Sequence, residues 1–174
     1  MLTAGTIAPD FSLPNQHRVD VRLSDFRGKN HVVIAFHPLA FTPVCGVQMQ
    51  AYEREHARLG ALDAHVLGIS NDAGPSKKAW ADSLGGISYD LLSDYHPHGA
   101  VAAQYGVLRA DGLAERAIFL VDKAGVIRWT ALHDIPDHPD VADLVRELQK
   151  LTGEFRRSMQ RQEKAGGDAT IGHE

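Results

Sequence analysis

The sequence contains only one cysteine, Cys45, among its 174 residues. An intrachain disulfide is therefore impossible, so no disulfide framework supports the fold and the thiol is expected to be free. A lone cysteine is most often a small buried residue without a chemical role. The residues around Cys45 therefore have to indicate a chemical role before one is assigned to it.

Long apolar runs and an excess of positive charge are also missing. The longest apolar runs, such as Val32 to Phe36, are far shorter than the roughly 20 residues of a membrane-spanning helix. A formal net charge of −4 and a pI near 6.2 leave no basic field for nucleic acid or anionic lipid. Met1 to Pro14 has neither the basic nor the apolar segment of a secretory signal. We therefore expect a cytoplasmic protein that binds neither nucleic acid nor membrane.

Several motifs of other enzyme classes are absent as well. No glycine-rich phosphate loop follows a predicted strand, and no serine stands in a nucleophile elbow. The sequence has ten histidines, including His96, His98, His133 and His138, but no cysteine or carboxylate cluster accompanies them. We expect neither a metal ion nor an organic cofactor.

The composition is that of one ordinary globular domain. Hydrophobic residues make up 44% of the chain and charged residues 23%. A chain of this length buries a substantial apolar core. Beyond Thr152 the chain is polar and contains Gly166-Gly167. We predict a domain over residues 1–152 and a polar C-terminal tail over 153–174, partly helical and partly disordered.

Strand and helix patterns alternate along the chain, which predicts an α/β domain in packed layers. A hairpin-like entry is expected within 10–25, buried strands over 32–36 and 65–70, and helices from Thr42-Pro43 to about Leu59 and over 76–84. After them we expect a short helix over 98–105, an antiparallel hairpin of 117–122 and 126–132, and a final helix with Val141, Leu144, Val145, Leu148 and Leu151 on one face.

Cys45 falls in the first turn of the helix that begins at Thr42-Pro43. A hydroxyl residue followed by proline is typical of an N-cap and a first helical position. The helix macrodipole and the unpaired backbone N–H groups favour an anion there, and the thiolate is the reactive form of cysteine. This position favours a nucleophile over a structural residue.

Pro38, Thr42 and Cys45 form the pattern Pro-x-x-x-Thr-x-x-Cys directly after a buried strand. This pattern resembles the active-site loop of the peroxiredoxin family, the AhpC/TSA-like proteins, and a histidine before the proline is common in its one-cysteine members. The segments 5–13, 23–28, 91–106 and 116–128 are also similar to family segments, so the resemblance covers most of residues 1–152. It is closest to the alkyl hydroperoxide reductase E group.

The resemblance implies a thioredoxin-like α/β fold with a mixed central sheet flanked by helices. It implies that Cys45 attacks the peroxide and that Arg116, just before a predicted strand, is the active-site arginine, with several donors for thiolate and peroxide. Pro38 would shield the thiol and shape the loop. Thr42 would hydrogen-bond the thiol or the peroxide, or only cap the helix.

Two further residues have more than one interpretation. His37 orients the peroxide or the thiol, or is a buried structural histidine at a strand end. Gln48 orients the peroxide, or hydrogen-bonds an arginine side chain without bringing a charge; it stands where most peroxiredoxins have glutamate.

The predicted function is that of a thiol-dependent peroxidase in antioxidant defence. It would reduce hydrogen peroxide and organic hydroperoxides through a sulfenic acid at Cys45. Gln50 stands where one subgroup has a resolving cysteine, so an external thiol must regenerate the enzyme: a low-molecular-weight thiol or a thioredoxin- or glutaredoxin-like protein. The family also implies a homodimer, formed through 97–105 and the loops near the active site.

Two other functions remain open from the residues alone. A thiol-disulfide oxidoreductase usually needs Cys-x-x-Cys, and Gln48 occupies the second position here. A redox sensor or holdase would use oxidation of Cys45 to change its binding to a partner.

Overall fold

The computed structural model describes residues 1–167, which form the alternating strands and helices that the sequence predicts. The elements in chain order are β1 (Ser12–Pro14), β2 (Asp20–Arg22), a 3₁₀ turn (Leu23–Phe26), β3 (His31–Phe36), α1 (Pro43–Arg54), α2 (His56–Ala61), β4 (Ala64–Ser70), α3 (Gly74–Ser83), β5 (Asp90–Ser93), α4 (Ala100–Gln104), β6 (Arg116–Val121), β7 (Ile127–His133) and α5 (Val141–Gly167).

The central sheet has five strands in the order β5-β4-β3-β6-β7. β3 pairs in parallel with β4, and β4 pairs in parallel with β5. β6 runs antiparallel to both β3 and β7, which form its two neighbours. The predicted mixed sheet flanked by helices is therefore confirmed, as are the entry hairpin of β1 and β2 and the hairpin of β6 and β7.

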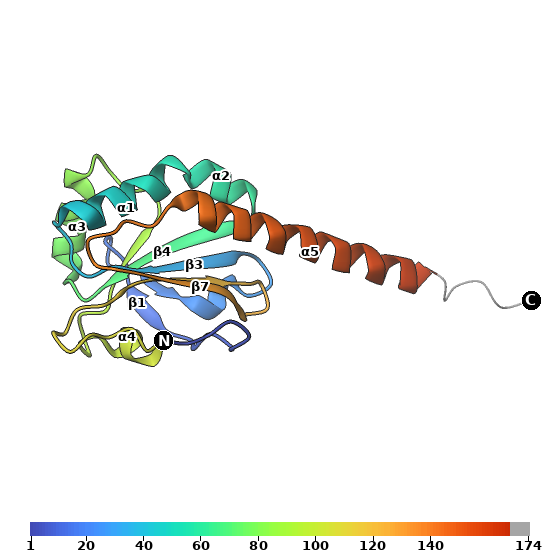
Figure 1. The fold of residues 1–174 in the computed structure, drawn as a ribbon, viewed down its shortest axis with the longest axis horizontal. Coiled ribbons are helices and arrows are strands. Elements are labelled where there is room, and N and C mark those ends of the chain that lie inside the picture. The colour runs from blue at the N-terminus through green and yellow to red at the C-terminus, as the bar shows by residue number, and fades with distance from the viewer. Residues whose placement is uncertain (168–174) are drawn as a thin grey trace, which may run out of the picture.

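β3 is the central strand, and all of its residues are buried because both faces of the sheet are covered. Val33 and Ala35 belong to the core under α1, α2, α3 and the first part of α5. Ile34 and Phe36 point to the opposite face, where the core includes residues of β1 and α4. Figure 1 shows these two layers, with α1, α2 and α5 on one side of the sheet and β1 and α4 on the other.

Two predicted helices differ in extent from the observed ones. The helix predicted from Pro43 to about Leu59 is divided at Glu55, whose backbone has φ −94° and ψ 4°. Periodicity does not predict this interruption, because Tyr52 and Leu59, seven residues apart, are both buried and have the spacing of one face of a continuous helix. The helix predicted over 98–105 is also shorter, since it begins only after Gly99, whose φ is 65°.

The final helix, α5, buries the predicted stripe over its first three turns, with Leu144, Val145, Leu148 and Leu151 in the core. Beyond Thr152 the helix continues to Gly167 and extends past the body of the domain (Figure 1). The predicted boundary at 152 stays a prediction, and the disorder predicted near the C-terminus concerns 168–174, which lie outside the described residues. No helix within 1–167 is both long and apolar enough to cross a membrane.

Candidate active site

The segment from His37 to Thr42, called the active-site loop below, connects the end of β3 to the start of α1. Thr42 has an extended backbone, and Pro43 begins the helix with its φ already fixed. Cys45 therefore lies in the first turn of α1, as predicted, and only 1% of its surface is exposed. Local sequence alone thus places the thiol at the positive end of a helix dipole.

Arg116 reaches the thiol from β6, the strand next to β3 in the sheet. Because the two strands are antiparallel, the first residue of β6 lies beside the end of β3 at which the active-site loop begins. Both η nitrogens of Arg116 lie 3.5 Å from Cys45 Sγ, and the arginine is only 1% exposed. The sulfur and the guanidinium, 71 residues apart in sequence, thus form a buried pair.

The guanidinium is held in place by oxygen acceptors on its other sides. Arg116 Nη1 donates to Gln48 Oε1 at 2.7 Å, and Nη2 donates to the carbonyl oxygen of Ile135 at 2.8 Å. Gln48 Nε2 in turn donates to Tyr52 Oη at 3.2 Å. Burial raises the pKa of Tyr52 to about 12, so this phenol stays protonated near neutral pH. These contacts fix the direction of the arginine fork toward the sulfur.

Sequence reasoning named Gln48 but missed Tyr52 and Ile135. Helical spacing could have found Tyr52. It follows Gln48 by four residues and Cys45 by seven, and residues at these spacings share one face of a helix. The Ile135 contact uses a backbone carbonyl in the loop before α5, and no side-chain pattern encodes it.

Thr42 and Pro38 shape the active-site loop itself. Thr42 Oγ1 donates to the Leu39 carbonyl at 2.7 Å, and Thr42 makes no side-chain cap to α1. The predicted capping role of Thr42 is therefore wrong, because its hydroxyl closes the turn before the helix instead. Pro38 is buried, whereas Thr42 is partly exposed beside the helix start.

His37 is fully buried and hydrogen-bonds a lysine. Its Nε2 lies 3.2 Å from Nζ of Lys77, and its ring centroid lies 5.3 Å from that of Trp80. Burial, and then the Lys77 charge, lower the pKa of His37 well below its usual value, so the ring is neutral. Of its two predicted roles, this geometry favours the structural one. Sequence reasoning did not identify Lys77.

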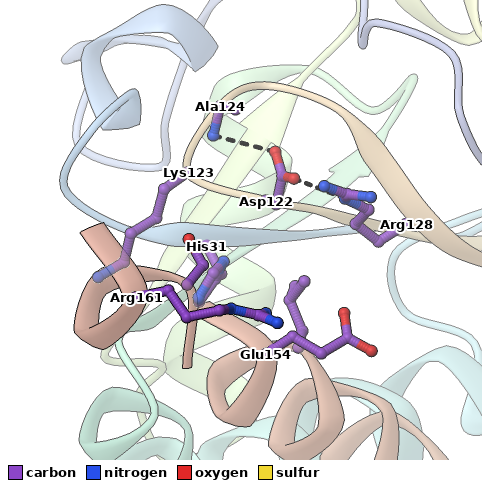
Figure 2. Close-up of a pocket in the computed structure, with 9 residues that line it drawn as sticks. His31, Asp122, Lys123, Ala124, Arg128, Glu154 and Arg161 are labelled. Atoms are coloured by element: carbon purple, nitrogen blue, oxygen red, sulfur yellow. Dashed lines mark hydrogen bonds and ion pairs between the residues drawn. The ribbon is translucent and has the colours of Figure 1, made fainter. Parts of the chain in front are cut away.

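A cavity of about 420 Å³ lies at the other end of β3, away from the thiol. Figure 2 shows its lining, in which His31, the first residue of β3, stands among charged side chains of both signs. Asp122 Oδ2 accepts from Arg128 Nε there at 2.6 Å. Since Cys45 is the chain's single cysteine, this cavity is not the place of thiol chemistry. Within 1–167, no three histidine, cysteine or acidic side chains gather as metal ligands would.

The arrangement around Cys45 suits nucleophilic attack by a thiolate. A cation with two donors on the sulfur stabilises negative charge on it, and the same fork can face an oxygen that becomes negative when a bond to it breaks. Several of the predicted site residues meet in this way: Cys45, Arg116 and Gln48 are in direct contact, Pro38 and Thr42 form the loop beside them, and His37 contacts Lys77 instead.

Comparisons with known proteins find one family in sequence and in fold. The pattern of the AhpC/TSA family matches residues 4–130. The chain is 38% identical over 133 residues to alkyl hydroperoxide reductase E of Mycobacterium tuberculosis, which covers 76% of this chain and 86% of that protein. Its fold is similar to the crystal structure of AhpC from Enterococcus faecalis, with a TM-score of 0.80 and 29% identity over 91% of this chain and 96% of that one. Peroxidoxin BcpB of Mycobacterium tuberculosis is also similar, with a TM-score of 0.77 and 27% identity over 87% and 99% of the two chains.

Proposed function

The chain belongs to the AhpC/TSA family of peroxiredoxins, and we propose from this membership that Cys45 is the residue with which it reduces hydroperoxides. As a peroxiredoxin the protein is a thiol-dependent peroxidase of antioxidant defence, and its single cysteine fits a one-cysteine mechanism. The observation that carries the assignment to Cys45 is the contact of both η nitrogens of Arg116 with its sulfur, each at 3.5 Å.

In the proposed oxidation, the Cys45 thiolate attacks one oxygen of the hydroperoxide. An S–O bond forms, the O–O bond breaks, and the other oxygen leaves with the bonding electron pair and takes up a proton to become water or an alcohol. The sulfur is oxidised by two electrons to a sulfenic acid while the peroxide is reduced by two. Arg116 stabilises first the thiolate and then the negative charge on the departing oxygen.

The proposed regeneration uses a thiol from outside the chain. Its sulfur attacks the sulfenic acid, releases water and forms a mixed disulfide with Cys45. A second thiol then attacks the mixed disulfide, which restores the reduced enzyme and releases an oxidised disulfide. A low-molecular-weight thiol or a thioredoxin- or glutaredoxin-like protein would fill this role.

The other site residues position or shield the arginine, the sulfur and the bound peroxide. Gln48 holds the arginine fork through its 2.7 Å hydrogen bond, and Pro38 shields the sulfur from water with a ring that has no N–H. Thr42 closes the turn of the active-site loop, which leaves its oxygen able to accept a hydrogen bond from a bound peroxide. His37 anchors the start of that loop.

Two properties of the whole protein belong to the same proposal. A catalytic thiol that must stay reduced suits a cytoplasmic location. A homodimer is proposed through 97–105 and the active-site loop. Phe41, in that loop, is 60% exposed, and Tyr95, two residues before 97–105, is 58% exposed.

Turnover separates a peroxidase from a redox sensor. Wild-type protein is mixed with excess hydrogen peroxide and each candidate reductant in turn: a low-molecular-weight thiol, a thioredoxin-like protein or a glutaredoxin-like protein. An enzyme consumes many equivalents of peroxide per chain with at least one of them. Consumption that stops after one equivalent with every reductant would refute the peroxidase in favour of a sensor.

A further inference from the structure

Behind the active-site loop lies a buried set of polar side chains that the proposed reaction does not use. Lys77, on α3, has no exposed surface, although lysine is almost never fully buried without partners. Its Nζ lies 2.8 Å from Ser70 Oγ and 3.2 Å from His37 Nε2. Because a buried ammonium is costly unless it is compensated, these contacts call for an explanation.

Both contacts of Lys77 lead to the active-site loop. Ser70 Oγ donates to Asp72 Oδ2 at 2.6 Å, and the same carboxylate oxygen accepts from the backbone N–H of Ala40 at 2.8 Å. The second branch reaches His37, the first residue of the loop. A single lysine thus connects to the loop at its beginning and again at its middle.

The loop needs such support because of its backbone conformation. Phe41 has a φ of 61°, in the left-handed region that is unfavourable for a residue with a side chain. Its ring is largely exposed, so packing of this side chain does not hold the turn. The hydrogen bond from Ala40 to Asp72 fixes the residue just before it.

We propose that Lys77 is a positioning residue for the peroxidase reaction, which fixes the active-site loop around the Cys45 sulfur through these two hydrogen-bonded branches. The proposal rests on the proposed function, in which Cys45 is the residue that attacks the peroxide. Lys77 touches neither the sulfur nor the substrate and acts through Asp72 and His37.

The charges that face Lys77 make this support sensitive to pH. Burial lowers the pKa of Lys77 to about 7, while Asp72, after β4, and the Cys45 sulfur, at the start of α1, oppose that shift. Neutral His37 faces it from the end of β3, and Arg116 of β6 acts on that histidine. Above about pH 7 the lysine therefore loses the charge that balances Asp72, and its hold on the loop weakens.

The test compares two adjacent lysines. Lys77→Met keeps the length of the side chain but removes its charge and donors. Lys78→Met is the matched control, because the Lys78 side chain is 45% exposed and pairs with Asp82 at 2.6 Å. Stopped-flow mixing with hydrogen peroxide gives the rate of Cys45 oxidation from about pH 6 to about pH 9, divided by the thiolate fraction from ultraviolet absorbance.

Wild type and Lys78→Met should show the same rate per thiolate, which falls as the pH rises through about 7. Lys77→Met should be about ten- to a hundredfold slower at the acid end of this range, as expected when reacting groups are misplaced by about 1 Å, and its rate per thiolate should not depend on pH. A folded Lys77→Met protein with the wild-type rate and profile overturns the proposal.

Asp72→Asn decides the question if Lys77→Met does not fold. This change keeps an acceptor for Ala40 but removes the charge that raises the pKa of Lys77, so the fall in rate should move to lower pH. An unmoved profile overturns the proposal. If wild type and Lys78→Met both fail to react with peroxide, the proposed function fails instead, so the two failures are distinguishable.

Discussion

The guanidinium of Arg116 is held in one direction and places its positive charge beside the buried sulfur of Cys45. Its fork is held by Gln48 and by the Ile135 carbonyl, so both η nitrogens stay aimed at Cys45. Arg116→Ala should slow oxidation of the thiolate about a hundredfold or more, the usual loss for a single transition-state donor. The measurement is the stopped-flow rate at a pH at which the thiol is ionised in both proteins.

Arg116→Lys is the matched variant, since it keeps the charge but loses the planar fork. It should restore the thiolate fraction more fully than the rate. Equal rates for Arg116→Ala and wild type, with both thiols ionised, would show that Arg116 only favours the thiolate and does not act on the peroxide oxygen.

His37 makes the stability of the fold depend on pH. Its pKa is lowered in the folded state, so below about pH 6.5 an unfolded chain binds a proton that the folded chain does not. The free energy of unfolding should therefore fall as the pH drops, by up to about 1.4 kcal/mol per pH unit for this residue.

His37→Gln removes this titration while an amide oxygen can still accept from Lys77. Urea unfolding at about pH 7.5 and about pH 5.5 measures the free energy of unfolding. Between these two pH values it should fall more for wild type than for His37→Gln. His31, whose pKa is also lowered, titrates in both proteins and does not affect the difference. Equal losses would mean that His37 is protonated in the folded protein.

Sequence motifs could name Cys45, Gln48 and Arg116 because the family pattern fixes their positions, and the structure brings these three together. Their catalytic roles stay predictions. Lys77 could not be named, since a lysine on a short polar helix is usually exposed and only the packing of α3 on the sheet buries it.

The two halves of α5 differ in how deeply their side chains are buried. The first half buries Leu144, Leu148 and Leu151, whereas the described side chains after Thr152 are largely exposed. A truncation after Thr152 should leave the melting temperature and the peroxidase activity nearly unchanged. Leu148→Ala, in contrast, should cost about 2–5 kcal/mol of stability, because it leaves a cavity in the core.

Thermal unfolding followed by circular dichroism gives the melting temperature of the truncated protein and of Leu148→Ala. A fall of many degrees on truncation would show that the second half of α5 packs in the native protein, and the predicted domain boundary at 152 would be wrong.

The sequence predicted where strands and helices lie along the chain better than it predicted which strands pair in the sheet. Periodicity identified β3 and the hairpin of β6 and β7, since a continuous apolar run and a short turn are local signals. The position of β3 between β4 and β6 depends on contacts distant in sequence, so no local pattern predicts it. The family resemblance implied only a mixed central sheet flanked by helices.

For the molecule as a whole, the proposed homodimer predicts the mass in solution. Light scattering at micromolar concentration should give the mass of a dimer. Tyr95→Asp should produce monomers, because it places a charge at the border of the proposed interface, two residues before 97–105. Leu132→Asp, on β7, should stay dimeric although Leu132 is equally exposed, at 58%. A monomeric wild type would refute the dimer, and monomers from Leu132→Asp alone would place the interface at the β7 edge of the sheet.

The most direct test of the central claim is the oxidation state of Cys45 after one addition of peroxide. Wild type mixed with one equivalent of hydrogen peroxide should gain one oxygen atom, trapped as a sulfenic acid at Cys45 by mass spectrometry, and should lose it again when a thiol is added. Cys45→Ser, folded to the same extent, should consume no peroxide. Peroxide consumption by Cys45→Ser at the wild-type rate, or a wild-type Cys45 that stays unoxidised while peroxide disappears, would contradict this account.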